Sequence, residues 1–178
     1  TPISVLIPTA DVNAAGQGAA VVTTSYADAA GNPAAPDVTT NLTIDTVAPG
    51  TFSAAVPEGP AITLAESISD GGLPVLVTLP SNAVAGDIIT VSIAGSAPVS
   101  YTVQAADVLA ITTPVSVLIL TADVPAGPSA VVTTTYTDPA GNAATPVTTN
   151  LTIDKVVPSV PTVTVPEGKA INLAESLS

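Results

Sequence analysis

The sequence predicts an all-β protein in which short strands form sandwiches with aliphatic inner faces. Apolar and polar residues alternate over short stretches, and turn residues recur about every 8 to 12 positions. The 18 prolines disfavour long helices. The chain has three tyrosines, one phenylalanine and no Cys, Met, Trp or His, so its core has to be built from Val, Ile, Leu and Ala.

A β-hairpin is predicted between residues 131 and 154, VVTTTYTDPAGNAATPVTTNLTID. One alternating stretch leads into Tyr136, and a second returns from Val147. Between them Asp138 to Asn142 forms the turn, because Gly-Asn tolerates positive φ and the Asp side chain can accept hydrogen bonds from the turn backbone. A near copy at residues 21–45, VVTTSYADAAGNPAAPDVTTNLTID, predicts the same hairpin earlier in the chain.

The chain contains an internal repeat. The segment beginning at Thr1 matches the one beginning at Thr113, and Asp45 matches Asp154, so the period is about 110 residues. A period of this size fits a compact β domain. We expect residues 1–48 to be the C-terminal part of a first repeat, residues 49–157 a complete repeat, and residues 158–178 the N-terminal strands of a third. The natural chain is accordingly expected to continue beyond both ends.

The complete repeat is expected to hold about eight strands. Six of them are predicted at residues 52–56, 61–69, 75–79, 87–93, 100–103 and 115–120, and the hairpin supplies the last two. One helical turn is expected at residues 104–109. Tyr26 and Tyr136 are expected to fill the cores of their repeats.

The formal net charge of −12 indicates which kinds of partner the protein can bind. Lys155 and Lys169 are the only basic residues, so the clustered Lys and Arg that nucleic acid binding requires are missing. The charge also argues against an anionic membrane surface, the apolar runs are too short to insert into a bilayer, and no signal-peptide pattern opens the sequence. Cations are the favoured partners.

An enzyme is not expected. Without His or Cys, a serine nucleophile would lack a base, and neither lysine is convincingly placed to act as one. Carboxylate pairs can hydrolyse glycosides, but such sites also use aromatic platforms, which this chain hardly offers.

Three segments together resemble a known family: YTDPAGN, NLTID-x-V-x-P and, earlier in the repeat, AGDIITVSIAG. They are similar to the bacterial Ig-like repeats of giant secreted adhesins, of the biofilm-adhesin and RTX-adhesin type. The resemblance implies Ig-like β-sandwiches in tandem, located outside the cell at its surface. It also implies that the repeats act as extenders that hold a terminal ligand-binding domain away from the cell, with calcium bound at the junctions between repeats.

Acidic residues are expected to converge at those junctions. In an Ig-like sandwich the loops between strands B and C and between strands F and G share one pole. Glu66 and Asp70, taken to lie near the end of strand B, are therefore expected to approach Asp138 and Asn142, and Asp45 of the preceding repeat to arrive there too. Such oxygen ligands suit Ca²⁺, which tolerates flexible loops better than Mg²⁺ does. Equivalent sites at other junctions are expected to use Asp28, Asn32, Asp154 and Glu175.

Turn chemistry is the alternative explanation for these residues. Asp before Gly-Asn is common in turns that bind nothing, and Asp at a strand end can simply be solvated. For Asp138 and Asp45 both interpretations stay open. Solvated turn carboxylates are predicted for Asp11, Asp37, Asp87, Asp107 and Asp123, while Glu58 and Glu167 are intermediate and the sequons at Asn41 and Asn150 are interpreted as strand pattern.

The leading hypothesis for function is a structural extender whose partners are neighbouring repeats in the same or adjacent chains. One alternative is a subunit of a self-assembling filament or surface layer, in which exposed strand edges associate between chains. A carbohydrate- or ice-binding module would need aromatic platforms or a flat, regular array of threonines. The short runs Thr133 to Thr135 and Thr148 to Thr149 do not provide such an array.

Overall fold

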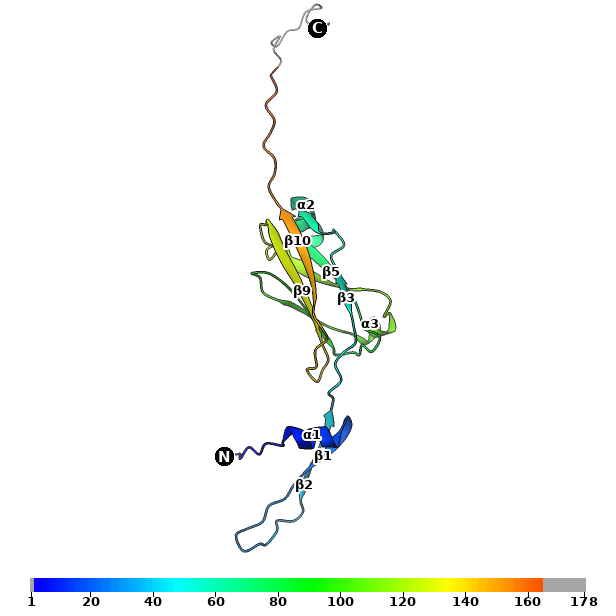
Figure 1. The fold of residues 1–178 in the computed structure, drawn as a ribbon, viewed down its shortest axis with the longest axis vertical. Coiled ribbons are helices and arrows are strands. Elements are labelled where there is room, and N and C mark those ends of the chain that lie inside the picture. Colours follow the sequence, from blue (N-terminus) through cyan, green and yellow to red (C-terminus); the bar gives the residue numbers. More distant parts are fainter. Residues whose placement is uncertain (1, 165–178) are drawn as a thin grey trace, which may run out of the picture.

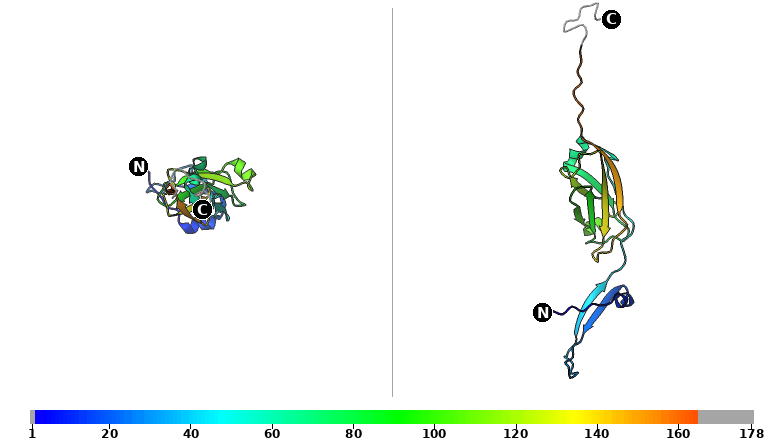
Figure 2. Two further views of the ribbon diagram at one scale, coloured as in Figure 1. Left: turned by 90° about the horizontal axis from the view of Figure 1, so that it is seen from above. Right: turned by 60° about the vertical axis from the view of Figure 1, so that its left-hand side comes forward.

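The structure is a computed structural model that describes residues 2–164. The molecule is elongated, with one β-sandwich in the middle (Figure 1). A separate hairpin with a short helix lies beyond one end of the sandwich, and an extended segment leaves the other end. Seen along the long axis, these parts lie one behind another (Figure 2).

The sandwich consists of two sheets. One has five strands in the order β4-β10-β9-β6-β7, and the other has three in the order β3-β5-β8. All pairs are antiparallel except β4 with β10, which is parallel. The strands are β3 (Ser53–Ala55), β4 (Ala61–Thr63), β5 (Gly72–Thr78), β6 (Ile88–Ile93), β7 (Val99–Thr102), β8 (Val115–Leu120), β9 (Ser129–Thr137) and β10 (Val147–Asp154).

This strand order is that of an Ig-like sandwich. Strands A, B and E correspond to β3, β5 and β8, while A′, G, F, C and C′ correspond to β4, β10, β9, β6 and β7. The predicted all-β sandwich is therefore confirmed. Most strands begin and end within a few residues of their predicted bounds, and the expected helical turn is α3 (Ala105–Leu109).

The core is aliphatic, as the composition requires. Alternate residues of β9 and β8 point inward, so that Val132 and Val117 are buried while their neighbours are exposed or half-buried. Tyr136 is fully buried and packs against Phe52, with ring centroids 5.6 Å apart. Tyr136 thus fills the core as predicted, whereas Tyr26 is exposed in this structure.

The predicted strand at residues 61–69 is wrong beyond Thr63. There the chain turns into α2 (Leu64–Ile68), followed by the short 3-10 helix η1 (Ser69–Gly71). A capping box starts α2: the Glu66 backbone N–H donates to the Thr63 hydroxyl, and the Thr63 N–H donates to the Glu66 carboxylate at 2.8 Å. Thr-x-x-Glu is the sequence signature of this motif. It overrides the strand propensity of the segment.

The first part of the chain shows how far structure depends on packing partners. Residues 2–48 form α1 (Thr9–Ala15), which the sequence did not predict, and a hairpin of β1 (Gly18–Thr24) with β2 (Val38–Ile44). Val5 is 84% exposed in a segment without regular structure, yet its counterpart Val117 is 3% exposed in β8. Val117 pairs with Val75 of β5, and within the described residues Val5 has no such strand beside it. No helix of residues 2–164 is long and apolar enough to cross a membrane.

The two faces of β6 give a direct test of the core. Ile89 is fully buried and Ile88 is 39% exposed. Replacing Ile89 by Ala should lower the free energy of unfolding by about 2 to 5 kcal/mol, because it leaves a cavity in a packed core. Ile88→Ala is the matched control and should cost about 0.5 kcal/mol or less. Urea denaturation followed by circular dichroism measures both, and equal losses would contradict the assigned face of the strand.

Candidate functional site

The turn between β9 and β10 is held by its own side chains. The backbone N–H of Asn142 donates to Oδ1 of Asp138 at 2.8 Å, and the Asn142 side-chain amide donates to Oδ2 at 2.8 Å. The Asp138 N–H donates in return to the carbonyl of Asn142 at 3.0 Å. Gly141 sits at φ 93°, a conformation that favours glycine. Both carboxylate oxygens of Asp138 are therefore engaged within the turn.

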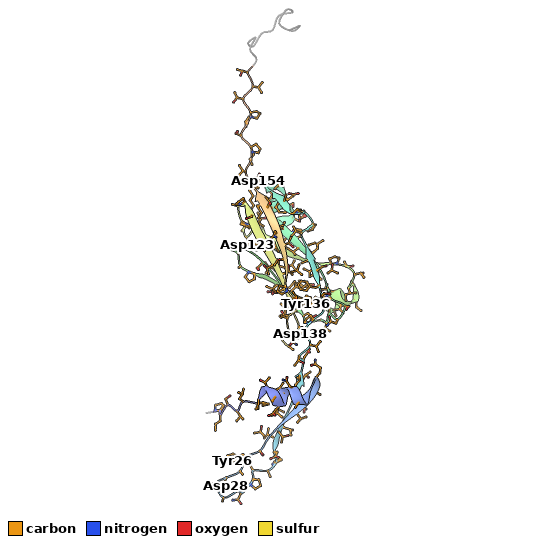
Figure 3. All side chains as sticks on the ribbon, in the orientation of Figure 1. Tyr26, Asp28, Asp123, Tyr136, Asp138 and Asp154 are labelled. Carbon is orange, nitrogen blue, oxygen red and sulfur yellow. The ribbon has the colours of Figure 1, made fainter. Side chains whose placement is uncertain are left out.

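The same turn recurs between β1 and β2. Asn32 donates to both oxygens of Asp28 at 2.9 Å, and the Asp28 N–H donates to the Asn32 carbonyl at 3.0 Å. Asp28 is exposed and lies at the free end of the hairpin (Figure 3). Because this copy forms without a surrounding sandwich, the Asp-x-x-Gly-Asn sequence itself determines the turn.

These hydrogen bonds also set the charge of the turn. The side-chain amide of Asn142 holds the pKa of Asp138 below its usual value of 3.8, and the amide of Asn32 does the same for Asp28. A hydrogen bond to a carboxylate stabilises its ionised form. Each turn therefore carries a fixed negative charge at neutral pH.

Asp45, at the end of β2, meets the later turn. The Asn142 side chain donates to the backbone carbonyl of Asp45 at 3.1 Å. Oδ1 of Asp45 accepts from the Gln17 amide at 2.5 Å and from the Val47 N–H at 3.0 Å. Gln17 in turn accepts two hydrogen bonds from Thr46, at 2.9 and 3.0 Å. The start of the linker is thus hydrogen-bonded both to the first hairpin, through Gln17, and to the sandwich, through Asn142.

A cleft of about 240 Å³ lies at this contact, which we call the junction cleft. Its lining residues come from both sides of the linker: Gln17, Asp45, Val47, Pro49, Asn82, Val84, Asp87, Asp138 and Pro139. Three of them are aspartates and none is basic. The structure therefore brings Asp45, Asp138 and Asn142 together, as expected, while their role as metal ligands stays a prediction.

Glu66 and Asp70 do not join them, and that expectation was wrong. They were placed near the end of strand B, but strand B is β5, which follows both residues. Thr63, the cap of the helix that contains Glu66, pairs with Asp154 at the far end of β10. Figure 3 shows Asp154 and Asp138 at opposite ends of the sandwich. The Glu66 carboxylate instead caps α2.

At the far pole, Asp154 repeats part of the Asp45 arrangement. Its Oδ1 accepts from the Val156 N–H at 2.9 Å, as that of Asp45 does from Val47. Lys155 takes the place of Thr46 and donates to the carbonyl of Val124 at 2.7 Å. Glu175, the predicted partner of Asp154, lies outside the described residues.

Asp87 is the residue that sequence reasoning missed. It was predicted to be a solvated turn carboxylate, yet only 1% of it is exposed, so that prediction was wrong. Its Oδ2 accepts from the Tyr136 hydroxyl at 2.6 Å and from the Val84 N–H at 2.9 Å. Its Oδ1 is buried and has no hydrogen-bond partner among residues 2–164. Burial, and then the bond to Asp87, raise the pKa of Tyr136, which keeps the phenol protonated as a donor.

The residue types of the junction cleft fit a hard cation, but their arrangement does not yet enclose one. All the charged groups that line the cleft are carboxylates, which suit Ca²⁺. The unpartnered oxygen of Asp87 also fits, since a buried carboxylate needs a compensating partner. Within residues 2–164, however, no three Asp, Glu, His or Cys side chains form a group that could hold a metal ion. Asp138 and Asp45 point oxygens at their own turn and linker instead.

Comparisons with known proteins give structural matches. No protein-family model matches the chain, and no curated protein matches it. One solved structure is a Ca²⁺-stabilized adhesin that helps an Antarctic bacterium reach out and bind ice; the identity is 26% and the TM-score 0.43, over 82% of this chain and 34% of that one. Another comes from work on the host cell surface retention of a 1.5-MDa bacterial ice-binding adhesin; the identity is 27% and the TM-score 0.41, over 78% of this chain and 43% of that one.

The chain thus covers less than half of each of these structures. Superpositions at such TM-scores do not establish a common fold. The Ig-like assignment therefore rests on the sheet order of this chain alone.

The two copies of the turn allow an internally controlled pH experiment. In Asn142→Ala the pKa of Asp138 should rise towards 3.8, while Asp28, with Asn32 intact, keeps its lowered pKa. Nuclear magnetic resonance titration of the carboxyl carbons measures both residues in one sample. An unchanged pKa of Asp138 would show that Asn142 is not the cause of its shift.

Asn142→Ala should also be less stable than the original chain, by an amount that depends on pH. A carboxylate whose pKa is lowered by folding stabilises the folded state above its unfolded pKa, and this contribution disappears as the pH falls through the folded pKa. The difference in the free energy of unfolding between the original chain and Asn142→Ala should therefore be largest at neutral pH and become smaller below about pH 4. Denaturation at a series of pH values measures it, and a difference that persists unchanged in acid would contradict this account.

Proposed function

We propose that this chain forms part of the extender stalk of a bacterial cell-surface adhesin, in which Ig-like repeats are joined end to end. The observation that carries the proposal is the contact between the linker carbonyl of Asp45 and the turn residue Asn142, which fastens one repeat to the pole of the next. The sandwich is entered at the pole of Asp138 and left at the pole of Asp154 (Figure 3). Repeats connected in this way extend in a line.

The dimensions suit a spacer. The longest strand, β9, has nine residues, which gives a repeat about 30 Å long at about 3.3 Å per residue. The linkers are short and contain proline, such as Pro49 in the first and Pro158 and Pro161 in the second. Proline fixes φ and so limits bending of the chain. The stalk would act without catalysis, and the ligand of the whole protein would be bound elsewhere in it.

Calcium at the junction would stiffen the stalk. Asp45 and Asp138 approach one cleft from two successive repeats, and like charges at short range repel. A divalent cation held by these carboxylates would replace repulsion with a shared ligand. Its contribution is electrostatic, while the residues of the chain hold the linker by the hydrogen bonds of Gln17 and Asn142. Removing the cation should leave a junction that is joined but less rigid.

A self-assembling filament or surface-layer subunit is the second candidate. One observation favours it: an apolar groove of about 340 Å³ between α1 and the first hairpin. Its apolar lining residues include Val12, Val22, Leu42 and Ile44. An exposed apolar surface of this kind can mark an interface with another chain. Light scattering in millimolar calcium separates the two functions, because an extender stays monomeric and an assembling subunit forms large particles.

The stiffness of the junction can be measured directly because the chain has no cysteine. Spin labels at Ala29→Cys, in the first hairpin, and Thr148→Cys, on β10, span the linker, and both positions are exposed. Their distance distribution by electron paramagnetic resonance should be broad in a chelator and narrow in millimolar calcium. Asp45→Asn should abolish the narrowing.

Asp37→Asn is the matched control for this experiment. It removes an exposed carboxylate of the first hairpin that does not line the junction cleft, so the narrowing should survive. A distribution that calcium leaves unchanged in the original chain would refute the stiffening. Narrowing that survives Asp45→Asn would place the cation away from the linker.

A further inference from the structure

Two strands that pair within the sandwich have their sequences repeated near the ends of the chain. Residues 38–45, which comprise β2 and the aspartate after it, read VTTNLTID, and this is also the whole sequence of β10. Residues 165–178 lie outside the described residues, but their sequence matches that of residues 56–69 except at three positions. Residues 56–69 contain β4, which pairs with β10. Each partner of this pair therefore occurs twice in the sequence.

The pair of β4 with β10 shows how the two sequences fit together. The strands are parallel, and Ile62 lies beside Ile153 in their register. Both side chains belong to the core, with only 2% of each exposed. The Thr152 N–H donates to the carbonyl of Pro60 at 2.7 Å. Backbone hydrogen bonds thus hold the added strand, and one isoleucine of that strand is buried, which is the usual division in strand addition.

The corresponding edge of the first hairpin is open. Within residues 2–164, β2 pairs with β1 alone. Leu42 and Ile44 are half-buried, whereas their counterparts Leu151 and Ile153 are each 2% exposed. Leu42 and Ile44 also line the apolar groove between α1 and the hairpin. An unpaired strand edge beside an apolar groove is a site at which a further strand can be added.

The C-terminal segment keeps the groups that the pairing uses. Ile171 stands in the place of Ile62, the buried isoleucine of β4. Lys169 replaces Pro60, which accepts a hydrogen bond through its backbone carbonyl, and lysine has the same carbonyl. Asn172 replaces the threonine that caps α2, and asparagine is an equally good cap. The third difference exchanges isoleucine for leucine. The segment is therefore chemically equivalent to β4 and the residues around it.

The direction of the chain favours pairing with a second molecule. Residues 155–164 leave the sandwich as extended chain, at the pole opposite the first hairpin (Figure 1). On this stretch Val160 and Val163 are 90% and 82% exposed, so the stretch does not pack on the sandwich. The hairpin that lies ahead of it along the long axis is therefore that of another chain. Such a contact is heterologous, and heterologous contacts that do not close into a ring build open filaments.

We propose that the open edge of β2 binds residues 170–172 of a second copy of this chain as a parallel strand, in the register that β4 and β10 have within the sandwich. In that register Ala170 lies beside Thr43, and Ile171 lies beside Ile44 in the apolar groove. This inference rests on the second candidate function, the self-assembling subunit, and specifies the contact between its chains. The contact needs no cation.

The first test follows the size of the full chain in solution. Sedimentation velocity in millimolar calcium should show a series of species that grows with protein concentration. Ile171→Asp should lower the association constant by about tenfold or more, because it places a charge where an isoleucine has to be buried. Ala170→Asp is the matched control. It adds the same charge at a position whose counterpart Ala61 is exposed, so this variant should associate as the original chain does.

The second test determines the register, and it uses the lack of cysteine in the chain. One variant carries Thr43→Cys and another carries Ala170→Cys. Mixed under mild oxidation, they should form a disulfide-linked pair with one chain of each kind, because registered residues of adjacent strands lie within disulfide reach. Thr39→Cys is the control for position. Thr39 is also exposed and on the same face of β2, but it lies about 13 Å from Thr43, so it should not cross-link.

The outcomes separate this contact from the function on which it rests. A chain that stays monomeric up to millimolar protein concentration would rule out both the contact and self-assembly, and would leave the extender in place. Large particles that Ile171→Asp does not affect would mean that another surface joins the chains, such as two hairpin grooves packed against each other. Self-assembly would then stand and the contact would be wrong. Equal cross-linking of Thr39→Cys and Thr43→Cys would contradict the register.

Discussion

The hydrogen bond between Tyr136 and Asp87 joins the core of the sandwich to the pole at which the linker from the first hairpin arrives. Tyr136 packs on Phe52 inside the sandwich, and two residues further along β9 the chain enters the Asp138 turn. The same strand therefore carries the largest buried side chain and the turn that holds the linker. Because the phenol and the carboxylate are both buried, losing either one removes a hydrogen bond that water cannot replace.

Local chemistry accounts for the parts of the fold that the sequence could predict. The Asp-x-x-Gly-Asn turn forms identically in an exposed hairpin and at the end of a sandwich, because its hydrogen bonds lie within five residues. Strand positions followed from alternation, and the aliphatic core followed from the absence of other large residues. Alternation alone does not make a strand, as the segment around Val5 shows. Its counterpart Val117 forms a strand because β5 pairs with it.

The errors have equally specific causes. Thr63 and Glu66 form a capping box, a signal that the sequence contained and the strand prediction passed over. Because the prediction took that segment to be strand B, it placed Glu66 and Asp70 at the wrong pole of the sandwich. Asp87 is a different case, since its partner Tyr136 lies 49 residues away and no local pattern links them. In the sequence, a buried aspartate cannot be told from a solvated one. The difference appears only when the sheet places β6 beside β9.

The single parallel pair of the sandwich has a mechanical consequence. Strand β4 is the second strand after the linker and runs beside the end of β10, from which the chain leaves. Tension applied between the two ends pulls these neighbours in opposite directions along their length. The three registered residue pairs from Thr152 to Asp154, together with the bond from the Thr152 N–H to the Pro60 carbonyl, are then loaded in shear. Bonds that lie across the direction of pulling share the force and must break together, so the sandwich resists extension along the line between its two ends.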